Sequence, residues 1–380
     1  DPKMDQYFGT PFWMADSKSL WMQWMNRDQN TLIIYSVDPQ SGSKNVIYEE
    51  KQNTWVDWFE NMYFFKNGQG FILKSDKSGW GHFYYYGLEG NLKRQLTSGS
   101  WRVTELLMVD ERAQEIYFTA RQENSTRNDL YRVGLKGTEE AQRLTFGNYD
   151  HQISLAPDGK HFITTYSNLT SPPKSALMDT KGNIIRGLAD SRGLAYDSYK
   201  MPKTELSYYQ TRDGLELPMT VILPLNFDPS KKYPVWISVY GGPDAGRVFD
   251  KWSNPLGQTY WWAKEGVIQV AIDNRSSGHL GKTGMDFIYR KMGKYEIEDY
   301  MDAANMLKSK PYVDGSRIGI TGGSFGGYMT AMALTYGADV FTHGIANYSV
   351  TDWALYDTHY TERFMGTPQN NPEGYKITSP

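Results

Sequence analysis

The sequence predicts a β-propeller in residues 1–200 and an α/β domain with a doubly wound, mostly parallel sheet in residues 201–380. Three observations predict this division. The chain has 380 residues, which is too many for one ordinary domain. Its first half repeats short runs of aromatic and β-branched residues between Gly, Asn, Asp and Ser turns, which indicates β structure. Its second half alternates apolar strands with helical segments, as layered α/β sheets do.

The β pattern of the first half recurs with a period of roughly 40 to 50 residues, and several short strands in each period are typical of propeller blades. Two units are followed by similar closing segments, residues 95–99 and 143–147, and residues 156–160 fit a hairpin turn of the kind that blades repeat. A β-sandwich is the alternative for this half. About four units can be counted, and because a closed ring leaves no sheet edge bare, we expect further blades before Asp1. The four units contain residues 32–38, 83–90, 130–137 and 175–182.

The two halves are separated by residues 190–203, which carry neither pattern. A helix is predicted from Tyr295 to Lys308, where apolar residues recur at helical spacing and acidic residues crowd the first turns. In a doubly wound sheet, ligands bind at the carboxyl ends of the strands. The predicted buried strands are residues 220–223, 235–240, 267–272 and 317–320.

A glycine-rich turn, residues 321–327, follows the last of these strands. Gly322, Ser324 and Gly326 fit G-x-S-x-G, in which the glycines allow a strand to turn sharply into a helix and expose the serine hydroxyl. The adjoining helix N-terminus favours developing negative charge. A serine in this motif is either a nucleophile or only the cap of a glycine-rich helix start, and the motif alone leaves both readings open.

Composition excludes several classes of function. A net charge of -3 and a pI near 6.1 argue against a nucleic-acid partner, because no basic stripe is present to neutralise phosphates. There is no cysteine, which excludes disulfides and thiolate metal sites, and no H-E-x-x-H spacing, so we expect neither a metal nor a cofactor. Aromatic residues make up 15% of the chain, which suits packing between sheets or an aromatic-lined site.

Several segments between about Leu206 and Pro380 match one known family. They are residues 231–234 leading into 239–243, 273–278, 293–299, the elbow extended through Thr330, and 353–366. On these segments the second half resembles the prolyl oligopeptidase family of α/β-hydrolase serine peptidases, and most closely its dipeptidyl peptidase IV branch. The first half resembles it more weakly, through the propeller pattern and residues 79–83.

The resemblance implies that Ser324 is the nucleophile. It also implies that the backbone N–H of Phe325 and the hydroxyl of Tyr240 form the oxyanion hole. Most relatives have a tyrosine where this chain has Phe325, but only the backbone is needed there. Without the resemblance, Tyr240 would be read as packing at a strand end.

The resemblance further implies a small apolar pocket for a penultimate proline or alanine, and a propeller aromatic, Phe59, that faces the substrate. As a bare pattern, Tyr356 and Tyr360 stand four apart on one helix face, which is more often core than pocket. The pocket residues are Val350, Trp353, Tyr356 and Tyr360.

Three charged residues near these motifs are given structural rather than catalytic roles. We expect Glu298 and Asp299 to be solvated charges and Arg363 to form a structural ion pair.

A nucleophilic serine needs a histidine base that is oriented by a carboxylate, in the chain order Ser, Asp, His. Only His343 and His359 follow Ser324, and neither stands where the family has its histidine. The resemblance therefore places the triad Asp and His after Pro380, and the acidic pair that grips the substrate amino group before Asp1.

The expected parent is a serine exopeptidase that releases N-terminal dipeptides after Pro or Ala, forms a homodimer, and is located in the periplasm or outside the cell. The first alternatives are a prolyl tripeptidyl or an acylaminoacyl peptidase of the same family. A small-ester hydrolase would leave the propeller without a purpose. The alternative of another class is a non-catalytic binding protein, against which the retention of Ser324 and Tyr240 argues.

We predict that the 380 residues alone do not hydrolyse peptides, because they contain a nucleophile without its base. Purified chain of this length should leave Gly-Pro-anilide intact over the course of a standard assay. Turnover at a rate normal for a peptidase would contradict the prediction.

Overall fold

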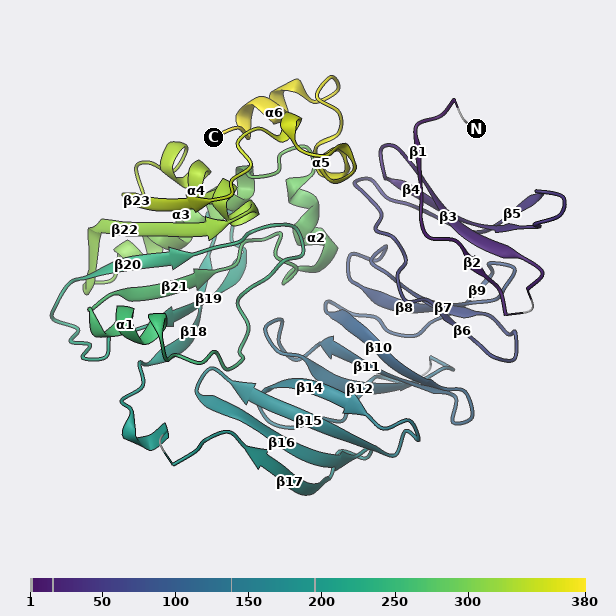
Figure 1. The fold of residues 1–380 in the computed structure, drawn as a ribbon, viewed down its shortest axis with the longest axis horizontal. Helices are drawn as coiled ribbons and strands as arrows, with labels where there is room; N and C mark the ends of the chain where they lie inside the picture. The colour runs from purple at the N-terminus through teal and green to yellow at the C-terminus, as the bar shows by residue number, and fades with distance from the viewer. Residues whose placement is uncertain (1–2, 16, 138, 195) are drawn as a thin grey trace.

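The computed structural model describes residues 3–15, 17–137, 139–194 and 196–380. In these residues the first half folds into four successive antiparallel sheets that form an arc beside the second half (Figure 1). The first sheet contains β1 (Gln6–Phe8), β2 (Phe12–Trp13), β3 (Leu20–Asn26), β4 (Thr31–Val37) and β5 (Lys44–Lys51). The second contains β6 (Tyr63–Phe64), β7 (Phe71–Ser75), β8 (His82–Tyr86) and β9 (Leu92–Gln95). The third contains β10 (Arg102–Asp110), β11 (Glu115–Arg121), β12 (Asp129–Gly134) and β13 (Gln142–Arg143), and the fourth contains β14 (Asp150–Leu155), β15 (His161–Asn168), β16 (Ser171–Asp179) and β17 (Ile184–Asp190).

The repeat predicted from the sequence is confirmed, because every unit falls on the third strand along the hydrogen-bonded order of its sheet, namely β4 in β1-β3-β4-β5 and β8, β12 and β16 in the other three. The predicted hairpin turn joins β14 to β15 and is closed by a hydrogen bond of 3.0 Å from Gly159 N to the Ala156 carbonyl. Its glycine has a φ of +65°, which explains why the turn ends in glycine.

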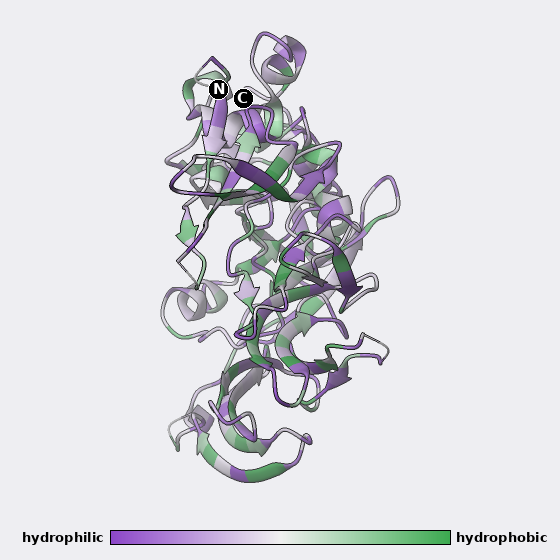
Figure 2. Cartoon of the chain, turned by 90° about the vertical axis from the view of Figure 1, so that its right-hand side faces the viewer, coloured by the Kyte–Doolittle hydropathy of each residue, from purple (hydrophilic) through white to green (hydrophobic). Residues whose placement is uncertain are grey.

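Apolar side chains join each sheet to the next one along the chain. Trp21 of the first sheet meets Phe71 of the second at a ring distance of 5.4 Å, and Phe83 of the second meets Phe118 of the third at 5.7 Å. Hydrophobic and hydrophilic residues are interspersed along these strands (Figure 2). The second sheet buries both of its faces, because Phe71 and Leu73 of β7 pack with the first sheet and Ile72 between them packs with the third. Consecutive packing of this kind is that of propeller blades, and the sandwich alternative is wrong.

The second half is built on a six-stranded sheet with the order β18-β19-β21-β20-β22-β23. The pairs β20–β21, β20–β22 and β22–β23 are parallel, whereas β18–β19 and β19–β21 are antiparallel. The strands are β18 (Thr204–Gln210), β19 (Glu216–Ile222), β20 (Tyr233–Ser238), β21 (Ile268–Ile272), β22 (Val313–Gly323) and β23 (His343–Asn347). The helices are α1 (Gln258–Lys264), α2 (Gly281–Met285), α3 (Lys294–Lys308), α4 (Phe325–Thr335), α5 (Thr358–Met365) and α6 (Pro372–Ile377), with short 3-10 turns η1 (Tyr196–Ser198), η2 (Asp286–Ile288) and η3 (Trp353–Leu355). No helix in the described ranges is long and apolar enough to cross a membrane.

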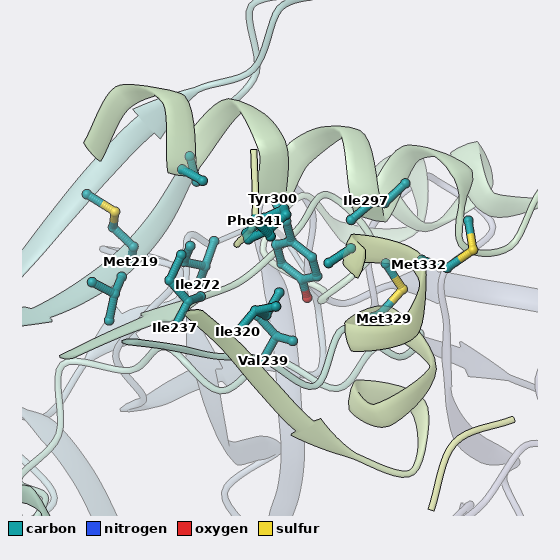
Figure 3. Packing of buried hydrophobic residues seen from close by; sticks show 14 of the residues in the cluster. Met219, Ile237, Val239, Ile272, Ile297, Tyr300, Ile320, Met329, Met332 and Phe341 are labelled. Carbon is teal, nitrogen blue, oxygen red and sulfur yellow. The ribbon is translucent and has the colours of Figure 1, made fainter. Parts of the chain in front are cut away.

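The core of the second half lies between its sheet and helices α3 and α4 (Figure 3). Ile237 and Ile320 from neighbouring parallel strands are fully buried, as are Ile297 and Tyr300 of α3 and Met329 of α4. The predicted helix differs from α3 by one residue at its start. This core holds the carboxyl ends of β20 and β22 in place.

The expectation that Asp299 is a solvated charge is wrong. Its side chain is fully buried and accepts hydrogen bonds from Arg275, including one of 2.7 Å from Nη2 and one of 2.9 Å from the backbone N. Arg275 is also buried and donates to Asp213. Burial raises the pKa of Asp299, and the Arg275 guanidinium opposes that rise. Glu298, in contrast, remains partly exposed.

We predict that Asp299→Ala lowers the free energy of unfolding by about 3 to 5 kcal/mol, because it leaves the buried Arg275 guanidinium without its main partner. Asp302→Ala is the matched control, since Asp302 lies on the same helix and pairs with Arg212, which is half exposed. Because the Asp302 side chain is only 13% exposed and also accepts a backbone hydrogen bond from Arg212, the control should cost a smaller amount, about 1 to 2 kcal/mol, in the same urea titration. Equal losses for the two variants would contradict the prediction.

Candidate active site

Ser324 lies between the end of β22 and the start of α4 in a sharply turned backbone. Its φ is 57° and its ψ is −121°, a conformation that non-glycine residues rarely adopt. The turn is held by a hydrogen bond of 3.0 Å from Ser324 N to the Asn347 carbonyl. Ser324 occupies the N-cap position of α4, but its side chain is exposed and makes no capping hydrogen bond, so the hydroxyl is not used as a helix cap.

The glycines of the motif are required by close approach of the neighbouring strand. A Cβ on Gly322 would lie 2.5 Å from the Val239 carbonyl oxygen, and one on Gly326 would come closer still to the same oxygen. A Cβ on Gly327 would overlap the carbonyl oxygen of Asn347. A side chain at Gly322 or Gly326 would therefore push the elbow away from the end of β20, and one at Gly327 would push it away from the end of β23.

Tyr240 follows β20 and lies beside the first residue of α4. Its ring centroid is 6.3 Å from that of Phe325, whose side chain is buried. A Cβ on Gly242 would lie 2.9 Å from Cε1 of Tyr240, so this glycine makes room for the ring. The backbone N–H groups in the first turn of a helix have no acceptor within the helix. The structure thus brings Tyr240 and the Phe325 N–H to the same end of the sheet as Ser324.

The four predicted pocket residues form one cluster with Phe325. The Trp353 ring centroid is 5.6 Å from Phe325, 5.8 Å from Tyr356 and 6.1 Å from Tyr360. Val350 packs against the same core. Burial raises the pKa of the Tyr360 hydroxyl, and nearby Tyr240 and Tyr356 raise it further, so this hydroxyl stays protonated.

The sequence interpretation of this cluster is wrong in one respect. Tyr356 does not share a helix face with Tyr360, because α5 begins only at Thr358 and Tyr356 is extended, with a φ of −91° and a ψ of 171°. The extended backbone leaves Tyr356 46% exposed, while Trp353 behind it is 2% exposed. The cluster therefore has a buried base and an open aromatic wall, as a pocket for a small apolar group requires.

Phe59 lies on the wall of a cavity of about 540 Å³ between the two halves of the molecule. It is 6% exposed and packs edge-on against Tyr48 at a ring distance of 5.4 Å. Its role toward a substrate stays a prediction.

No described residue hydrogen-bonds to the Ser324 hydroxyl. His343 contacts Thr342, and His359 packs against the ring of Tyr7 at 4.8 Å, where burial lowers its pKa. Across the described ranges, no group of three or more His, Cys, Asp or Glu side chains is arranged to hold a metal ion.

Comparisons with known proteins cover both halves. Residues 1–173 match the family described as the dipeptidyl peptidase IV N-terminal region, and residues 252–380 match the prolyl oligopeptidase family. The solved structure of Porphyromonas gingivalis dipeptidyl peptidase 4 superimposes with a TM-score of 0.90 at 32% identity, covering 98% of this chain and 53% of that one. A putative dipeptidyl aminopeptidase IV from Bacteroides ovatus gives 0.89 at 33% identity, covering 99% and 56%.

The chain belongs to the prolyl oligopeptidase family. Within that family it falls in the dipeptidyl peptidase IV branch. It is 31% identical to dipeptidyl peptidase 4 of Trichophyton rubrum over 100% of this chain and 50% of the relative, and 33% identical to a probable dipeptidyl-aminopeptidase B of Aspergillus oryzae over 99% and 43%. The chain thus spans about half the length of the curated relatives that it matches.

The propeller holds helix α5, which carries Tyr360 of the predicted pocket. Arg27 donates two hydrogen bonds of 2.8 Å to Glu362, and Gln29 donates one of 2.6 Å to the His359 carbonyl. Arg363 pairs with Asp57 at 3.1 Å, so the ion pair expected for Arg363 is confirmed. The propeller partners were missed from the sequence, because nothing local marks a contact between residues more than 300 positions apart.

We predict that Gly326→Ala lowers the free energy of unfolding by about 1 to 3 kcal/mol, because the new methyl group collides with the Val239 carbonyl. The matched control is Gly187→Ala on β17, where an added Cβ meets no atom within 4 Å. The control should shift stability by no more than about 0.5 kcal/mol. A Gly326→Ala variant as stable as this control would show that the elbow tolerates a side chain.

Proposed function

We propose that this chain carries the nucleophile, oxyanion hole and specificity pocket of a serine exopeptidase that releases N-terminal dipeptides from peptides. The observation that carries the proposal is the position of Ser324. Its exposed hydroxyl stands on a strained elbow, with Tyr240 and the Phe325 N–H next to it and the Trp353 cluster directly behind Phe325.

In the proposed reaction the Ser324 oxygen attacks the carbonyl carbon of the scissile bond. Negative charge that develops on the carbonyl oxygen is stabilised by the Phe325 N–H and the Tyr240 hydroxyl, as in other oxyanion holes. The amine leaves, the dipeptide remains as an ester on Ser324, and water then releases it. The described histidines do not contact Ser324, so the proposed mechanism takes the proton-accepting base from outside these 380 residues.

The pocket supports a preference for proline or alanine as the second residue of the substrate. Flat aromatic walls from Tyr356 and Tyr360 suit a pyrrolidine ring. An additional methylene in such a pocket changes binding by only about 1 to 3 kcal/mol, so proline over alanine is a preference and not an absolute rule. On the resemblance alone we further propose a homodimer located in the periplasm or outside the cell.

Release of tripeptides or of acylated amino acids by the same chemistry is the alternative within the family. These activities differ in how the propeller grips the amino end of the substrate, and they share the elbow and pocket. A non-catalytic binding role is the alternative of another class. The strained backbone and exposed side chain of Ser324 argue against it, because backbone strain lowers stability and is typically found at active sites.

We predict that Ser324→Ala in the full-length protein lowers turnover of Gly-Pro-anilide by several orders of magnitude while the circular dichroism spectrum stays unchanged. Ser316→Ala, at the opposite end of the same strand, is the matched control and should keep full activity. Parallel assays with Ala-Ala-Pro-anilide and acetyl-Ala-anilide separate the dipeptidyl from the tripeptidyl and acylaminoacyl alternatives. Unchanged turnover in Ser324→Ala would refute the assignment.

A further inference from the structure

The side chain of Arg247 lies over the ring of Tyr240. The guanidinium carbon is 4.9 Å from the ring centroid, within the range of a cation–π contact. The side chain is exposed, and within the described ranges its guanidinium makes no ion pair and no side-chain hydrogen bond. By contrast Arg192, which lies over Tyr196, is neutralised by Asp197. The charge of Arg247 is therefore uncompensated where it meets Tyr240.

The backbone beneath Arg247 is fixed by a buried carboxylate. The Arg247 N–H donates to Asp273 Oδ1 at 2.9 Å and to Oδ2 at 2.8 Å, and the Val248 N–H donates to Oδ2 at 2.8 Å. Asp273 is fully buried. The preceding Gly246 runs so close that a Cβ there would lie 3.1 Å from Asp273 Oδ2. The backbone at Arg247 is thus fixed by these hydrogen bonds, which limits the positions that its guanidinium can occupy.

The propeller reaches the same loop from two sides. His279 Nε2 is 2.8 Å from Asp273 Oδ2, and its Nδ1 is 3.1 Å from the Ser125 hydroxyl of the propeller. Arg102 of β10 forms a bidentate ion pair with Asp244, which lies in the same loop. The loop from Tyr240 to Val248 is therefore linked to the propeller at two points. Arg102 binds Asp244 directly, and Ser125 is connected to the backbone of Arg247 through His279 and Asp273.

We propose that Arg247 is a positioning residue for Tyr240 in the oxyanion hole. The guanidinium is attracted to the face of the phenol ring and fixes its orientation, so the hydroxyl is already aimed when negative charge develops. The inference rests on the proposed function, and it concerns a residue that acts through Tyr240 and does not itself touch the substrate.

A double-mutant cycle in the full-length protein tests the inference, with Gly-Pro-anilide as substrate. Arg247→Met should lower kcat by about fivefold, with KM unchanged within about twofold, because the stacked charge acts in the transition state. In a Tyr240→Phe background, Arg247→Met should cause no further loss. Arg247→Lys should retain most of the rate, since an ammonium can still lie over the ring. Arg186→Met, on exposed β17, is the control for loss of a surface charge and should change nothing.

The inference is overturned if Arg247→Met leaves kcat unchanged, changes KM alone, or lowers kcat equally in both backgrounds. The Ser324→Ala comparison in the same assay keeps the two questions apart. Turnover that survives loss of the serine counts against the proposed function. Serine-dependent turnover with independent effects of Arg247 and Tyr240 counts against this inference alone.

Discussion

The structure of the site depends on one close approach, that of the Val239 carbonyl to the glycines on either side of Ser324. Because Gly322 and Gly326 have no side chains, the end of β20 can lie directly against the elbow. That contact brings Tyr240, the next residue after Val239, beside the start of α4. The parallel pairing of β20 with β22, from Val235 opposite Ile318 to Ser238 opposite Thr321, sets the register that makes the contact possible.

The propeller contacts the proposed serine site on two sides. It holds helix α5 through Arg27 and Gln29, and it holds the loop after Tyr240 through Arg102 and Ser125. The two sides of the proposed serine site are thus tied to the first and the third sheets of the propeller. Electrostatic stabilisation of a transition state is strongest when the stabilising groups need no reorganisation. Contacts that hold Tyr240 and the pocket residues in place would therefore favour the proposed reaction.

The parts of the fold that could be predicted are those with a local signature. The third strand of each blade carries a repeated pattern, and α3 has a clear apolar face, so both were predicted closely. Strand β18 was not predicted because it lies at the edge of the sheet, where only Tyr209 is buried and the pattern is mostly polar. Asp299 was misjudged because its partner Arg275 lies 24 positions earlier, and only the tertiary fold shows that both are enclosed. The ion pair of Arg102 with Asp244 joins residues 142 positions apart and depends on the tertiary fold in the same way.

The aromatic richness of the chain shows why composition could not separate packing from function. Rings such as Phe71 and Phe118 are fully buried between blades, whereas Tyr356 is half exposed and packs against Trp353. The two uses are distinguished by what lies behind each ring. Trp353 and Phe325 form a buried base that is continuous with the elbow itself, so a group seated against Tyr356 is fixed relative to Ser324 by direct packing. This packing would fix the proposed pocket relative to the proposed nucleophile.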